Sequence, residues 1–144
     1  MPLTDQHRFG MQLAQMSRGW RAELDRRLAG LNLSQARWLV LLHLARFDDA
    51  PTQRELAQSV GVEGPTLARL LDSLEAQGLV RRQAVLEDRR AKKIHLCPPA
   101  KPLIDQIETI ANALRAELFT GVDEEEMRVC MKVHARILAN LEKS

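Results

Sequence analysis

The sequence has 144 residues, of which 45% are hydrophobic and 28% are charged, and its formal net charge is +2. This length suits one domain and is too short for a TIM barrel or a two-domain dehydrogenase. The composition is that of a folded protein. Aromatic residues make up only 3%, which argues against a large β-sandwich and against a stacking platform for single-stranded nucleic acid.

The sequence shows no sign of export, of a membrane span or of a metal site. Its first ten residues lack an apolar signal segment, and its longest apolar stretch, 38–45, is too short to cross a bilayer. Cys97 and Cys130 lie far apart and form neither a disulfide framework nor a zinc pattern. We therefore expect a cytoplasmic protein with free thiols, no metal and no cofactor.

Apolar periodicity predicts a mainly helical chain with one β-hairpin. In chain order, the predicted elements are helices at residues 7–30, 34–47, 52–59 and 64–77, strands at 79–83 and 93–96, a helix from Leu103 to Leu118 and a helix at 124–142. Gly30 and Gly78 are expected to end the first and fourth helices. A charged loop at 86–91 separates the strands, so the order is α-α-α-α-β-β-α-α.

Three helices begin with recognisable capping residues. Ser34 precedes the second helix, Thr52 with Glu55 forms a capping box at the third, and Asp123 with Glu126 forms one at the sixth.

The first and last helices are long for a domain of this size. Their apolar stripes are wider than the middle of the chain can cover, so we expect them to associate with a second copy of the chain. Cys130 and His134 lie on the stripe of the last helix and are expected to pack within it. A compact monomeric bundle is the alternative.

Residues 53–72 fit a helix-turn-helix pattern. Two helices that cross steeply through a tight turn need a small residue where they touch and a residue that tolerates positive φ in the turn. Ala57 and Gly61, the fifth and ninth positions counted from Gln53, meet these needs. The surrounding apolar positions are Leu56, Val60, Val62, Leu67 and Leu70. An ordinary αα-hairpin is the alternative.

Positive charge gathers directly after this motif. Residues 79–101 hold seven Lys and Arg against two Asp and Glu, which indicates a phosphate-facing surface, with a solvated loop as the alternative. Helix 64–77 would then enter the major groove of DNA with its exposed N-terminal residues, which are Gly64, Pro65, Thr66 and Arg69. Arg69 can bond guanine O6 and N7, unless it pairs with Asp72 or Glu75.

The hairpin would serve as a wing, residues 84–93, whose tip places an arginine in the adjacent minor groove. Asp88 fits this role if it orients Arg90 through a bidentate pair. The residues expected to contact phosphates are Arg82, Arg89, Lys92 and Lys93.

The helix-turn-helix is followed by Gly78-Leu79-Val80-Arg81-Arg82 and then by Asp88-Arg89-Arg90-Ala91-Lys92-Lys93-Ile94-His95-Leu96. This sequence resembles the MarR family of winged-helix transcription regulators, and most closely its SlyA branch. By position, Pro65 and Arg69 match contacts of the recognition helix, and Asp88 and Arg90 match the wing motif.

The resemblance implies a homodimer that binds a pseudo-palindromic operator in double-stranded DNA. Residues 1–33 and 101–144 would form the helical dimerisation region, and residues 34–100 would form the DNA-binding lobe. It also implies release of DNA by a small aromatic or anionic effector. The candidate effector-binding residues are Arg18, Arg21, Trp38 and Arg82.

Two other functions stay open at this point. Cys97, flanked by Lys93 and His95, would suit a thiol-based redox-sensing regulator, as some members of the family are. A winged helix that binds proteins is the second alternative, although the basic wing favours DNA. The sequence holds no phosphate loop, HExxH, nucleophile elbow or GxGxxG motif, so we do not expect an enzyme.

Overall fold

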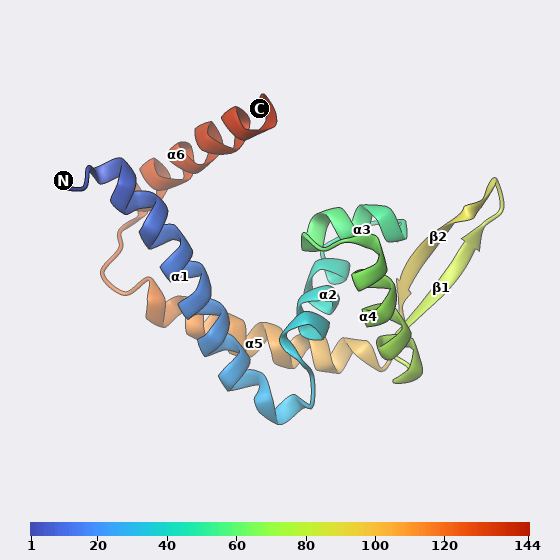
Figure 1. Ribbon diagram of the computed structural model, residues 1–144. Coiled ribbons are helices and arrows are strands. Elements are labelled where there is room, and N and C mark those ends of the chain that lie inside the picture. Colours follow the sequence, from blue (N-terminus) through green and yellow to red (C-terminus); the bar gives the residue numbers. More distant parts are fainter. The chain divides into compact units, whose positions relative to one another are not determined.

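The helices and the hairpin follow the predicted order (Figure 1). Along the chain they are α1 (Asp5–Leu28), the 3-10 helix η1 (Ala29–Leu31), α2 (Gln35–Ala45), α3 (Gln53–Val60), α4 (Gly64–Ala76), β1 (Val80–Val85), β2 (Asp88–Leu96), α5 (Ala100–Leu118) and α6 (Glu124–Glu142). This computed structural model describes the backbone of residues 1–144 and the side chains of residues 1–87 and 91–144. The chain divides into two units, Met1–Asn112 and Ala113–Ser144, which are described separately.

The predicted helix caps are present. The Arg37 N–H donates to Ser34 Oγ at 3.4 Å. In the two capping boxes, the side chains of Thr52 and Asp123 accept from the backbone N–H groups of Glu55 and Glu126. The carboxylates of Glu55 and Glu126 accept in return from the backbone N–H groups of Thr52 and Asp123. These contacts satisfy N–H groups that have no partner inside the helix.

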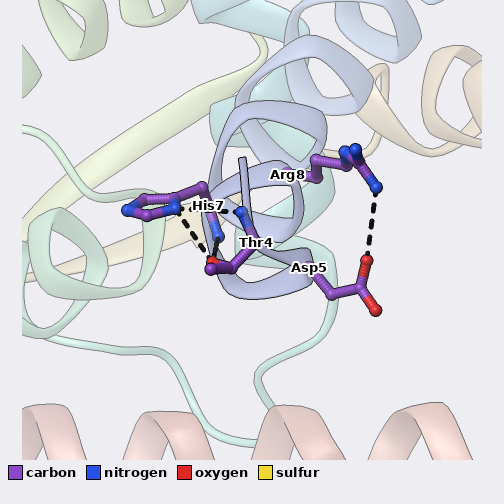
Figure 2. Close-up of polar contacts among 4 residues, drawn as sticks. All are labelled: Thr4, Asp5, His7 and Arg8. Carbon is purple, nitrogen blue, oxygen red and sulfur yellow. Dashed lines mark hydrogen bonds and ion pairs between the residues drawn. The ribbon is translucent and has the colours of Figure 1, made fainter. Parts of the chain in front are cut away.

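A further capping box at α1 was not predicted from the sequence. The His7 N–H donates to Thr4 Oγ1 at 3.2 Å, and His7 Nδ1 accepts from the Thr4 N–H at 3.2 Å (Figure 2). Arg8 pairs with Asp5 in the same turn. Histidine is absent from the usual capping-box pattern, which places Glu or Gln at that position, and this explains why the sequence pattern started the helix two residues late.

The prediction that Gly30 ends the first helix is wrong. The chain continues from α1 into η1, and the residue with left-handed backbone is Asn32, with φ of 56°. Asparagine is one of the few residues other than glycine that adopt this conformation readily.

The core of the first unit forms around α2. Trp38, Val40 and Leu41 of α2 are buried, and so are leucines of α1, α3 and α4; those leucines are Leu28, Leu56, Leu67, Leu71 and Leu74. Figure 1 shows α2, α3 and α4 gathered together, with the hairpin extending from them. Burial of α2 on several sides agrees with its nearly continuous apolar sequence.

The hairpin is longer and its turn tighter than predicted. Val80 lies opposite Leu96 and Val85 opposite Asp88, with an irregularity between Ala84 and Val85. The predicted loop 86–91 is therefore wrong, since the turn is Leu86 and Glu87 and β2 begins at Asp88. A run of charged residues lacks the apolar–polar alternation by which a strand is recognised, so the charges concealed the first part of β2.

A short segment before α3 pairs with the other edge of β2. The Ile94 N–H donates to the Pro51 carbonyl at 2.9 Å, and Thr52 forms a bridge with Lys93. The base of the wing is thus attached to the start of α3 as well as to β1. The sequence predicted only two strands, because a bridge of one or two residues leaves no alternating pattern.

Apolar side chains are exposed on both terminal helices. On α1, Leu24 and Leu28 are buried, whereas Leu13 and Met16 are exposed. On α6, in the second unit, the exposed set is Val129, Met131, Val133, Ile137, Leu138 and Leu141. Among the described residues, no helix combines the length and the apolar character that a bilayer crossing requires.

Cys130 does not pack in a core of the single chain, and its packing against a second copy stays a prediction. The thiol is exposed, and Sγ lies 3.6 Å from Nε2 of His134. Four residues apart on a helix, the two side chains share a face. The contact between Cys130 and His134 therefore forms at the surface of this chain.

Candidate DNA-binding surface

The turn between α3 and α4 has the geometry predicted from Ala57 and Gly61. Gly61 adopts φ of 84°, and the N–H groups of Gly61 and Val62 both donate to the Ala57 carbonyl, at 2.9 and 3.1 Å. Ala57 is buried at the point where the helices approach. The turn therefore holds α4 at a fixed position relative to α3.

One side of α4 is buried and its N-terminal half is open on the other. Leu67, Leu71 and Leu74 have no exposed surface, which fixes the rotation of the helix about its axis. The predicted contact residues lie toward solvent: Gly64, Pro65 and Arg69 are exposed, and Thr66 is half-buried. No ion pair of Arg69 is found among the described side chains, and Asp72 and Glu75 pair with a different arginine.

A hollow of about 620 Å³ lies between α3, α4 and the wing. It is lined by Gln53, Arg54, Ala57, Gln58, Val62, Gly64, Ala68, Arg82 and Lys92. The sequence predictions included Gly64, Arg82 and Lys92 but missed Arg54 and Gln58. These two are four residues apart on α3, on the side away from Leu56, and that spacing was the available signal.

Arg82 joins α4 to the wing. Its Nη2 donates to Asp72 Oδ1 at 2.5 Å and to Glu75 Oε1 at 3.0 Å, and its backbone N–H donates to Glu75 Oε2 at 3.1 Å. We call these three residues the Arg82 cluster. The hydrogen bonds that Glu75 accepts from Arg82 lower the pKa of Glu75. The hydrogen bonds to Asp72 and to Glu75 raise the pKa of Arg82.

The lysines of the wing lie on opposite faces of the hairpin. Lys92 is opposite Ala84 and, by the alternation of the strand, shares a face with Arg82 and Ile94. Lys93 is on the other face, where its charge contributes to lowering the pKa of Glu55, after the hydrogen bonds from Thr52. Lys92 and Lys93 are both exposed.

The side chains of Asp88, Arg89 and Arg90 lie outside the described residues. Their backbone forms the first part of β2, and their predicted roles at the wing tip stay predictions.

Comparison with known proteins assigns the family. A sequence model of the MarR family matches residues 30–91, which include the whole helix-turn-helix. A protein solved as transcriptional regulator PA3341 is 70% identical, with 94% of this chain and 99% of that chain covered and a TM-score of 0.89. The chain belongs to the MarR family of transcriptional regulators. A MarR-family regulator from Silicibacter pomeroyi is 26% identical, with 97% and 96% of the two chains covered and a TM-score of 0.84.

More distant MarR-like structures share the winged-helix fold. The S. aureus MepR–DNA complex is 23% identical, with 96% of this chain and 99% of that chain covered and a TM-score of 0.82. SlyA is 19% identical, with 94% of each chain covered and a TM-score of 0.83. The predicted fold class and family are confirmed, and at this identity the likeness to SlyA concerns the fold.

The residues predicted for effector binding occupy different settings in this MarR-family protein. Trp38 is 2% exposed, and its Nε1–H donates to Asp25 Oδ1 at 3.4 Å. Arg18 and Arg21 are exposed, whereas Arg82 is held in the Arg82 cluster. Trp38 therefore offers no open aromatic wall in this structure, and the effector set stays a prediction.

Cys97 lies where the wing meets α5. It is half-buried, and it borders a cavity of about 430 Å³ with Ala45, Leu96, Pro98, Lys101, Ile104 and Asp105. Its N–H donates to the Leu79 carbonyl at 2.9 Å. The thiol is thus close to a cavity, and its predicted redox role stays open.

Proposed function

We propose that the protein is a homodimeric regulator that binds a pseudo-palindromic operator in double-stranded DNA, and that it is not an enzyme. The observation that supports this best is the exposed N-terminal half of α4 beside the hollow that Arg54 and Lys92 line. An α-helix presented in this way fits the major groove, and the neighbouring cations fit its phosphates.

The predicted contacts other than Arg82 each have a place in this proposal, and Arg54 joins them. Gly64, Pro65, Thr66 and Arg69 would meet base edges and nearby phosphates, and Arg54, Lys92 and Lys93 would contact the backbone. Arg89 would add a phosphate contact, and Arg90, oriented by Asp88, would enter the minor groove. Residues 34–100 would form the DNA-binding lobe, and residues 1–33 and 101–144 the dimerisation region.

The test is selection of genomic fragments by the purified protein, followed by titration of the selected duplex and of a scrambled duplex. We expect the selected duplex to bind roughly 10³-fold or more tightly than the scrambled one. Affinity for both should fall steeply with salt concentration. A protein-interaction module would show neither preference nor salt-dependent duplex binding, and that outcome would refute the proposal.

An effector and a redox response are separate parts of the proposal. A small aromatic anion should displace the selected duplex in a saturable manner if the protein takes an effector. Peroxide should abolish binding, with recovery in reductant and resistance in Cys97→Ser, if Cys97 is a redox sensor. The two responses are distinguishable because only the second is lost in the cysteine variant.

A further inference from the structure

The Arg82 cluster is built differently from a phosphate-binding site. The Arg82 side chain is only 18% exposed, whereas Asp72 and Glu75 are 64% and 41% exposed. A phosphate approaching from solvent would therefore meet carboxylates around an arginine that is already paired. One arginine and two carboxylates also carry a combined charge of −1, which repels DNA.

Glu75 accepts hydrogen bonds from both the backbone and the side chain of Arg82 in β1. One of its oxygens accepts from the Arg82 guanidinium and the other from the Arg82 backbone N–H. Charge-assisted bonds of this kind are stronger and more directional than neutral ones. The last turns of α4 are thereby attached to β1 at two points of the same residue.

The attachment continues across the wing. Arg82 lies opposite Ile94 on β2, and the Ile94 N–H donates to the Pro51 carbonyl just before α3. The N–H groups of Arg82 and Ile94 both point outward from the hairpin, so α4 is bonded to β1 and the start of α3 to β2, and the pairing of the two strands joins these attachments. The hollow that would receive DNA is bounded by these same elements.

We infer that Arg82 is a positioning residue that fixes α4 relative to the wing, and is not a phosphate contact. The inference rests on the proposed DNA-binding function and assigns a different role to a residue that the sequence placed among the phosphate contacts. Its consequence is that Arg82 contributes to operator preference, because a displaced recognition helix loses base contacts before it loses general attraction to DNA.

The first experiment compares Arg82→Gln, Arg82→Lys and Arg81→Gln. Arg81 is the neighbouring arginine, it is exposed and bonds Gln83, so Arg81→Gln removes the same charge without touching the Arg82 cluster. We expect Arg82→Gln to weaken operator binding about 10-fold, comparable to the loss of one base contact. The slope of log affinity against log salt should not change.

Arg82→Lys distinguishes the two roles. A lysine keeps the charge but cannot donate to two carboxylates with a planar fork, so we expect it to behave like Arg82→Gln. Arg81→Gln should stay close to wild type. If Arg82→Lys binds like wild type, or if Arg82→Gln reduces the salt slope by about 0.9 with equal losses on all sequences, Arg82 is a phosphate contact and the inference is wrong.

A second experiment does not depend on DNA binding at all. Melting temperatures of Arg82→Gln, Glu75→Gln and the double variant form a cycle that isolates the coupling between the two residues. We expect the double variant to melt no lower than the less stable single variant. Fully additive shifts would show that the cluster does not form in solution and would overturn the inference even if the operator is never found.

Glu75→Gln also gives a test of opposite sign. It removes a negative charge near the candidate surface, so electrostatics alone would tighten binding to every duplex. A positioning role requires weaker binding to the operator and a smaller preference over scrambled DNA. Tighter binding with unchanged preference would contradict the inference.

Discussion

Arg69 occupies the exposed side of α4 opposite three buried leucines, so its position is set by the core and not by an ion pair. We predict that Arg69→Ala weakens operator binding by about 1–3 kcal/mol and relaxes base preference at one position. Titration of the operator and of its single-base variants would measure both. Arg46→Ala, which removes an exposed charge at the end of α2, is the control. Equal losses on random DNA would count against a base contact.

Arg54 should act differently, because it lines the hollow from α3 and not from the recognition helix. We predict that Arg54→Ala weakens binding to operator and scrambled DNA by a similar factor. The salt slope should become shallower by about 0.9, the value for one phosphate contact. A change in base preference without a change in slope would place Arg54 at a base edge instead.

At the scale of single residues, the sequence predicted which side chains are exposed on α4 but not which charges pair. Asp72 and Glu75 lie three and six positions beyond Arg69, so helix spacing favoured a pair within α4. The structure pairs them with Arg82, seven to ten positions beyond them, because β1 returns alongside α4. Contacts that depend on chain reversal leave no local pattern.

At the scale of elements, the turn between α3 and α4 depends on one backbone conformation. A Cβ at Gly61 would meet no neighbouring atom, yet φ of +84° is unfavourable for an L-residue. We predict that Gly61→Ala lowers the free energy of unfolding by about 1 kcal/mol and that Gly61→Asn costs less. Denaturant unfolding would measure both. Gly30→Ala is the control and should be close to neutral, since Gly30 has no positive φ.

Helix α1 contains an ion-pair network with a definite pH dependence. Arg26 and Arg27 hydrogen-bond Glu23 and lower its pKa from 4.5 to about 2. Because the pKa is lower in the folded state, the stabilisation is complete above pH 4.5 and is lost as pH falls toward about 2. We predict a smaller acid-range fall in melting temperature for Glu23→Gln than for wild type. High salt should reduce the difference, since exposed pairs are screened.

The element order and both predicted capping boxes were accessible from the sequence, because each rests on residues within one or two turns. The His7 cap, the left-handed Asn32 and the early start of β2 were not accessible. At His7 and at the start of β2, a residue type outside the usual preference took the role, whereas Asn32 has the usual preference but lies beyond the glycine that the pattern favoured. The pairing of β2 with residues 51 and 52 stabilises a strand that local residue preferences do not predict.

At the scale of the whole molecule, the exposed apolar side chains of α6 favour association with a second copy. We predict a solution mass close to twice the 16.3 kDa of one chain. Leu138 is 60% exposed in one protomer, so Leu138→Glu should leave the fold intact while it shifts the mass toward one chain and weakens operator binding. Light scattering and circular dichroism would measure the mass and the fold.

Ala139→Glu is the matched control, because Ala139 lies on the opposite side of α6 from the apolar stripe. It should keep the mass of the wild-type protein. If both glutamate variants remain at the wild-type mass, α6 does not form the dimer contact.

The bonds that connect α4, the wing and the start of α3 limit how a bound compound can release DNA. Elements joined in this way should tilt and shift together, so internal distortion of one protomer is an inefficient route to induction. In the proposed dimer, the remaining variable would be the spacing between the two copies of α4, which would have to match one turn of B-DNA, about 34–36 Å. A compound that changes this spacing by a few ångströms, far from any base pair, would then be sufficient to free the promoter.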